Sequence, residues 1–85
     1  MSASRVAKNV YAAQLAGEAV LLHLDTKRYY RLNATGAEVW KGIEAGESRE
    51  AIVERLIREF SVEPEVAGVD VDRLLERLRE AHLIE

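Results

Sequence analysis

The 85-residue chain contains no cysteine, and this absence excludes several kinds of chemistry. Disulfide cross-links, thiolate nucleophiles and cysteine-based zinc sites are all ruled out. A reducing compartment is the simplest setting for such a chain. Because no cross-link stabilises it, a domain of this size depends on one compact core or on a partner.

Long apolar runs are also missing. No stretch approaches the ~20 apolar residues of a membrane-spanning helix, and the N-terminus lacks the apolar middle section of a signal peptide. We therefore expect a cytoplasmic protein with no membrane partner.

The sequence has no glycine-rich phosphate loop and no nucleophile elbow, and His23 and His82 have no second ligand at helical spacing. It predicts no catalytic residue, no metal, no cofactor and no enzymatic activity.

Basic residues are too few for a nucleic-acid-binding surface to be expected. The net charge is −3, whereas duplex binding relies on lysine and arginine to neutralise phosphates. The charge is uneven, with six basic and four acidic residues up to Gly46, a net of +2. From Glu47 onward, six basic residues accompany eleven acidic ones, a net of −5.

What the chain does contain is typical of a folded protein. Hydrophobic residues make up 48% of it and charged residues 32%, which predicts one domain over residues 1–85, with residues 1–4 flexible. Two short apolar and aromatic runs, Ala19–Leu24 and Arg28–Leu32, predict a hairpin. A weaker strand is expected within Val6–Leu15. Apolar residues occupy both the even- and the odd-numbered positions of Ala19–Leu24. We therefore expect this segment to be the central strand, covered on both faces, between two edge strands.

After Asn33 the apolar period becomes helical. The spacing of Thr35 and Glu38 predicts a capping box that starts a helix, with Trp40 on its apolar face and its end at Gly46. Ser48 is the expected N-cap of a second helix, which runs to about Phe60. A third helix is expected to begin near Pro64, and its apolar positions are followed by Leu83-Ile84 at the end of the chain.

Three runs of residues resemble one known family. They are Leu21–Trp40, whose most specific part is L-N-x-T-G followed by a helix with tryptophan, then Ala51–Leu56 and Asp72–Leu78. The sequence resembles the PqqD-like family of precursor-peptide recognition elements, and within it the stand-alone proteins of lasso-peptide pathways. The resemblance implies a winged-helix-like α+β domain, with a three-stranded antiparallel β-sheet followed by three α-helices. The sequence departs from many members of the family at Lys27, where they have glycine. The hairpin therefore needs either a lysine at positive φ or another turn type.

The resemblance also implies a non-catalytic function. Such a domain captures the leader region of a ribosomally made precursor peptide as an added antiparallel strand, between the third strand and the third helix. It then presents the precursor to the leader peptidase and the cyclase of the pathway. Carried onto this chain, the peptide-binding residues are Lys27, Arg28, Tyr29, Tyr30, Arg31 and Leu32 on the strand and Val71, Asp72, Leu74, Leu75, Leu78 and Arg79 on the helix.

Helical spacing divides the helix residues into two stripes, and the sequence does not decide which stripe faces the peptide. Val71, Leu74 and Leu78 form one stripe, and Asp72, Leu75 and Arg79 form the other. The charged residues of the expected edge strand also have a simpler interpretation, since charge on an edge strand protects against aggregation.

Three other functions remain open at this point. A protein of the pyrroloquinoline-quinone (PQQ) pathway would use the same binding mechanism with another precursor. A winged-helix DNA-binding regulator has a similar architecture, but the segment Glu63–Glu85 carries seven acidic residues and three arginines, which disfavours it. A fragment of a larger modifying enzyme is the third alternative. The Met1 start and the Leu83-Ile84-Glu85 end favour a stand-alone protein instead.

Overall fold

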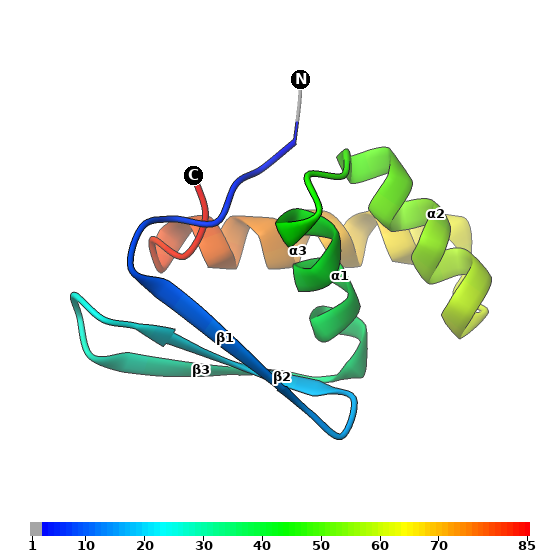
Figure 1. The fold of residues 1–85 in the computed structure, drawn as a ribbon. Coiled ribbons are helices and arrows are strands. Elements are labelled where there is room, and N and C mark those ends of the chain that lie inside the picture. The colour runs from blue at the N-terminus through cyan, green and yellow to red at the C-terminus, as the bar shows by residue number, and fades with distance from the viewer. Residues whose placement is uncertain (1–2) are drawn as a thin grey trace.

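In the computed structural model, which describes residues 3–85, three antiparallel strands are followed by three helices (Figure 1). The strands form one sheet in the order β1-β2-β3 and comprise β1 (Val10–Leu15), β2 (Glu18–His23) and β3 (Arg28–Leu32). The helices are α1 (Ala34–Glu44), α2 (Arg49–Phe60) and α3 (Pro64–Glu80). The predicted α+β class and order of elements are confirmed. Of the residues expected to be flexible, Met1 and Ser2 lie outside the described residues, and Ala3 and Ser4 belong to an irregular segment.

Two tight connections set the register of the sheet. Ala16 and Gly17 join β1 to β2 with φ values of +51° and +82°, a pair of positive values that suits the right-handed twist of a two-residue hairpin. The loop from β2 to β3 ends at Lys27, with φ of +63°, and its N–H donates to the His23 carbonyl oxygen at 2.8 Å. Of the two turn options, the structure therefore uses lysine at positive φ. Lys27 lies in this loop, so the strand starts at Arg28.

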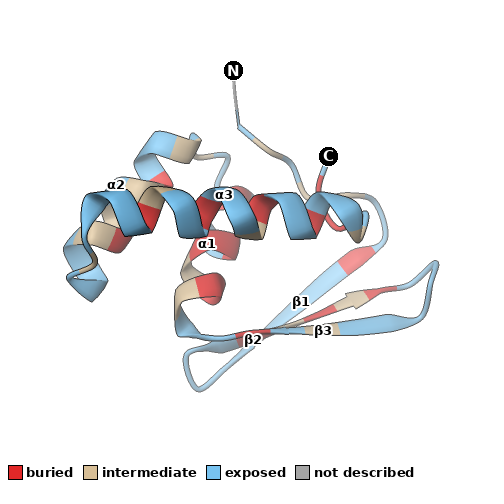
Figure 2. Cartoon of the chain, turned by 180° about the vertical axis from the view of Figure 1, so that it is seen from behind, coloured by how far each residue is buried: buried red, intermediate tan, exposed pale blue. Residues whose placement is uncertain are grey.

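The sheet is covered on one face only. Ala19, Leu21 and His23 of β2 are buried under the helices, whereas the side chains of Tyr11 and Tyr29 on the opposite face are 58% and 71% exposed (Figure 2). The prediction that the central strand is covered on both faces is therefore wrong. All three helices follow the sheet in the chain and pack on the same side of it, so nothing in residues 3–85 covers the outer face.

The core lies between the inner face of the sheet and the helices. Trp40 of α1 is fully buried at its centre, and its indole Nε1–H donates to Glu44 Oε2 at 2.9 Å. Both α2 and α3 contribute buried aliphatic side chains, among them Leu56 and Val71. Leu83 and Ile84 close the core after α3 ends.

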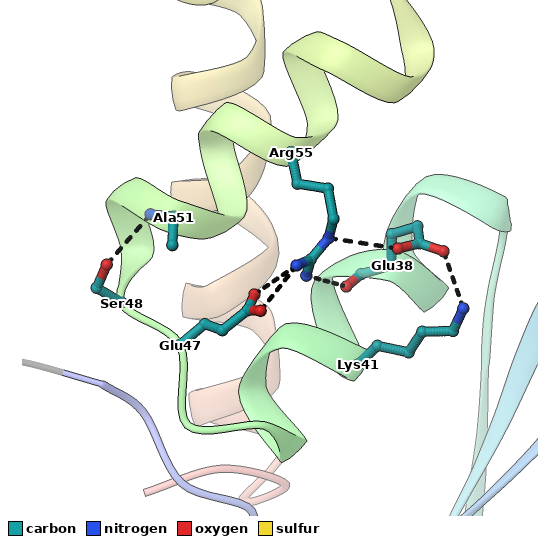
Figure 3. Close-up of polar contacts among 6 residues, drawn as sticks. All are labelled: Glu38, Lys41, Glu47, Ser48, Ala51 and Arg55. Carbon is teal, nitrogen blue, oxygen red and sulfur yellow. Dashed lines mark hydrogen bonds and ion pairs between the residues drawn. The ribbon is translucent and has the colours of Figure 1, made fainter.

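Side-chain caps define where α1 and α2 begin. Asn33 caps α1, because its side-chain oxygen accepts from the Gly36 N–H at 2.9 Å. The predicted capping box is thus wrong, and Glu38 instead forms ion pairs with Lys41 and Arg55 (Figure 3). Ser48 caps α2, as predicted, by accepting from the Ala51 N–H at 3.1 Å.

The two ends of the described chain pair with each other. Val6 and Ile84 form an antiparallel bridge, the Ala7 N–H donates to the Leu83 carbonyl oxygen at 3.0 Å, and the Glu85 N–H donates to the Arg5 carbonyl oxygen at 2.7 Å. This strap, residues 5–7, holds the C-terminal residues against the core. None of the helices within residues 3–85 has the length and apolar character needed to cross a bilayer.

Candidate functional site

A groove runs between β3 and α3, which lie on the same side of the molecule (Figure 2). Its main part has a volume of about 680 Å³. From the strand side it is lined by Thr26, Arg28, Tyr30, Arg31 and Leu32, and from the helix side by Leu74, Arg77, Leu78, Glu80, Ala81, His82 and Leu83. A smaller hollow continues it beyond the end of β3, toward Asp70 and Arg73 of α3, the cap residue Asn33, and Thr35 and Gly36 of α1. We call both parts together the β3–α3 groove.

The groove combines an apolar lining with charged side chains. Leu78 and Leu83 are buried core residues that contribute to its lining, and the half-buried Tyr30 and Leu74 are partly accessible in it. The exposed charged residues in its lining are mainly arginines from both β3 and α3. Such a surface can hold apolar side chains while charged groups remain at the water boundary.

Within residues 3–85, no strand lies next to the outer edge of β3. The Leu24 N–H donates to the Asn9 carbonyl oxygen, so the backbone groups of even-numbered residues in β2 point toward β1 and those of odd-numbered residues toward β3. From the observed register, Arg28, Tyr30 and Leu32 therefore direct their N–H and C=O groups toward β2. Those of Tyr29 and Arg31 point to the open edge, where an added strand could pair with them.

The strand residues predicted for the site divide by side-chain direction. Arg28, Tyr30, Arg31 and Leu32 line the β3–α3 groove. Tyr29 and Arg31 alternate with Arg28, Tyr30 and Leu32, so their side chains leave the strand on the outer face of the sheet. Arg31 pairs there with Glu18 at 3.0 Å and also borders the groove, and Lys27 lies in the preceding loop.

The helix residues predicted for the site lie on different sides of α3. Leu74 and Leu78 line the groove, and Val71 is fully buried in the core. Asp72, Leu75 and Arg79 line a separate hollow of about 310 Å³ on another side of α3, beside the start of α2. The stripe with Leu74 and Leu78 is therefore the one that faces β3. The stripe with Asp72 and Arg79 is turned away from the groove because α3 packs with that side toward α2.

An ion pair crosses the separate hollow. The Arg49 guanidinium donates two hydrogen bonds to the Asp72 carboxylate, one of them from Nη2 to Oδ2 at 2.9 Å. This hydrogen bonding, together with the arginine charge, holds the pKa of the Asp72 carboxyl below its ordinary value. Asp72 is thus engaged in joining α3 to α2.

Sequence reasoning missed two arginines of the groove, Arg73 and Arg77. Both are exposed on α3, one residue before and three residues after Leu74. Helical spacing places these positions on the same side as Leu74, so they could have been found once Leu74 was assigned to the groove. Sequence alone did not make that assignment.

The histidines occupy different settings. His23 is buried on the inner face of the sheet, where its Nδ1 accepts from the Asp25 N–H at 3.3 Å. His82 lines the end of the groove, at φ of +60°. In the part of the chain that the structure describes, no three histidine or acidic side chains gather in a way that could hold a metal ion.

Comparison with known proteins identifies the family and agrees with the fold. Residues 18–84 match the family model for coenzyme PQQ synthesis protein D, PqqD. The solved structure described as TbiB1 in complex with the TbiA(beta) leader peptide has a TM-score of 0.90 and 33% sequence identity, with 95% of this chain and 94% of that chain covered. A structure described as lasso peptide synthetase B1 complexed with the leader peptide also has a TM-score of 0.90, at 26% identity and with 99% of each chain covered. A search of curated proteins found no significant match. Because the family model spans most of the sequence, the chain belongs to the PqqD family.

Proposed function

We propose that this protein binds the leader region of a precursor peptide as an added strand on β3 and has no catalytic activity of its own. The observation that carries this proposal is the open edge of β3 beside the β3–α3 groove. Two solved structures with the same fold contain leader peptides, which supports the assignment of a leader to this chain.

The mechanism follows from strand geometry. Backbone groups of the leader pair with those of Tyr29 and Arg31, and this pairing supplies affinity that does not depend on leader sequence. Every second leader side chain then points toward the groove, where Leu74 and Leu78 contribute to its apolar lining. Because only certain side chains fit there, the groove supplies the specificity.

The bound leader would be delivered to enzymes that act on the rest of the precursor. We propose the leader peptidase of a lasso-peptide pathway as the first such partner and its cyclase as the second. One of the two solved structures is a lasso peptide synthetase B1, which supports this choice of pathway. A cytoplasmic location stays a prediction.

A PQQ-pathway function is the second candidate, and the match to the PqqD family model favours it. The groove would serve the same mechanism there, so the identity of the bound peptide separates the two. DNA binding is less well supported, because Asp70 and Glu80 lie beside the arginines on the exposed side of α3.

The test is a calorimetric titration with three synthetic peptides: the leader and core halves of a candidate lasso precursor, and a PQQ precursor. We expect saturable one-to-one binding of the lasso leader half alone. Mass spectrometry of the peptides after incubation checks that the protein leaves them unmodified. Binding of the PQQ precursor alone would favour the second candidate, and failure of all three peptides to bind would contradict peptide recognition at this groove.

A further inference from the structure

The β3–α3 groove is richer in arginine than the rest of the protein. Four of the nine arginines of a chain with net charge −3 line it: Arg28 and Arg31 on β3, and Arg73 and Arg77 on α3. Only two carboxylates, Asp70 and Glu80, line the same groove. The groove is therefore locally cationic in an acidic protein.

Most of these arginines have no carboxylate partner. Within residues 3–85, no carboxylate oxygen lies within 4.0 Å of Arg28, Arg73 or Arg77, although Asp70 and Glu80 stand three helical positions from Arg73 and Arg77 respectively. Outside the groove, by contrast, Arg49 pairs with Asp72 of α3 and Arg55 pairs with Glu38 of α1. Arg28, Arg73 and Arg77 thus keep their charge available to a ligand, whereas Arg31 already pairs with Glu18 at 3.0 Å.

The arrangement of Arg73 and Arg77 also has a cost for the free protein. They stand four positions apart on α3, where two like charges repel each other and slightly destabilise the helix. A bound carboxylate between them would convert this repulsion into two attractive interactions. An apolar or neutral ligand would leave it unchanged.

We propose that the groove selects leaders that carry acidic residues, with at least one carboxylate placed against Arg73 and Arg77. This inference rests on the proposed function, since it assumes an extended peptide paired with β3. The apolar leader residues then contact Leu74 and Leu78 inside the groove, and the acidic residues meet the arginines at its water boundary. Complementary charge at such a boundary contributes to specificity and to the rate of association.

The test selects binders from a phage-displayed library of random twelve-residue peptides. It compares the native protein with the double variant Arg73→Gln/Arg77→Gln. A matched control, Arg5→Gln/Arg58→Gln, removes the same total charge at exposed arginines outside the groove. A further variant, Leu74→Asp, places a charge inside the groove and shows which selected peptides bind there. Thermal melts followed by circular dichroism establish that each variant is folded.

We expect peptides selected by the native protein and the control to be enriched in aspartate and glutamate, and those selected by Arg73→Gln/Arg77→Gln to lose this enrichment. A single acidic peptide should bind the groove double variant roughly 3- to 10-fold more weakly at low salt, with a smaller difference at high salt. Two results would refute acid selection while leaving peptide binding intact. In the first, the selected peptides require Leu74 but show no excess of acidic residues; in the second, peptides selected by Arg73→Gln/Arg77→Gln show the same acidic excess as those selected by the native protein. If no peptide depends on Leu74, the proposed function fails as well.

Discussion

At the scale of single residues, Gly42 lets two helices approach each other. It lies in α1 beside the Arg55 side chain of α2, which pairs with Glu47 at 2.7 Å and with Glu38 at 3.5 Å (Figure 3). A Cβ atom on Gly42 would stand 2.6 Å from Ile52 Cγ1 and 2.8 Å from Arg55 Nη2. Because Ile52 is in the core and Arg55 is held by two carboxylates, neither neighbour can move away easily.

We therefore predict that Gly42→Ala lowers the free energy of unfolding by ~1–3 kcal/mol, the usual cost of an extra methyl group in a packed core. Gly68→Ala is the matched control, because it also lies inside a helix and its new Cβ would meet only the Arg49 guanidinium, at 3.3 Å, which needs a much smaller shift. The control should gain up to ~1 kcal/mol from helix propensity. Urea denaturation measures both, and equal stability of the two variants would contradict the close-approach argument.

Leu74 and Leu75 are adjacent residues with different tasks. Leu74 is half-buried in the groove, whereas Leu75 is only 6% exposed and belongs to the core cluster. Leu74→Asp should leave the protein folded and raise the Kd for a bound leader by ~30-fold or more, equivalent to about 2 kcal/mol.

Two further variants serve as comparisons for Leu74→Asp. Leu75→Asp should instead lower the melting temperature strongly, because it places a charge in the core. Val69→Asp adds the same charge at a position of α3 outside the groove lining and should change neither property much. If Leu74→Asp and Val69→Asp bind the leader with equal affinity, the binding surface is not the groove beside Leu74.

At the scale of elements, β3 has one edge paired with β2 and one edge open. Proline removes the N–H of a strand residue, so its effect depends on which edge that N–H faces. Arg28 faces β2 and Arg31 faces the open edge, and the two share the same side-chain type. Proline substitutions at these two positions therefore form a matched pair, which separates an effect on folding stability from an effect on leader binding.

Compared with Arg31→Ala, Arg31→Pro should keep the fold but lose leader affinity, because one backbone donor to the added strand is missing. Compared with Arg28→Ala, Arg28→Pro should mainly lower the melting temperature, because it removes a donor within the sheet. Calorimetric titration and thermal melts measure the two effects. If both proline variants fold and bind as well as their alanine partners, the leader does not pair with β3.

At the scale of the whole molecule, the strap of residues 5–7 links the two ends of the chain. Its backbone hydrogen bonds to Leu83 and Glu85 hold the C-terminal residues over the core (Figure 1). Val6 and Ala7 also pack against this core. The groove, by contrast, takes none of its lining residues from the strap.

Deletion of residues 2–7 should therefore destabilise the fold without removing the binding surface. The loss of three hydrogen bonds predicts a fall of ~2–4 kcal/mol in the free energy of unfolding, since each contributes about 0.5–1.5 kcal/mol. Deletion of residues 2–4 alone is the control and should change little. Guanidinium unfolding curves measure the difference, and equal stability of the two deletions would mean that the strap does not contribute.

Local features of the chain were predictable because they depend on neighbouring residues. The change from a strand period to a helical period after Asn33 predicted the order of elements, and Ser48 predicted the start of α2. The start of α1 was missed because Thr35 and Asn33 are both good caps. Asn33 directly follows β3, and the point at which that strand leaves the sheet decides between them.

The candidate site was only half determined by the sequence. Its pattern identified β3 as an edge strand and α3 as an amphipathic helix, because alternation and helical periodicity are local properties of the chain. The strand-side and helix-side residues that line the main part of the groove are more than 40 positions apart in the chain. Only the packing of α3 against α2 and in the shared core brings them together. That packing turns Leu74, Arg73 and Arg77 toward β3 and Asp72 toward Arg49. The helical period shows which residues of α3 share a face, but the neighbouring elements decide the direction in which each face points.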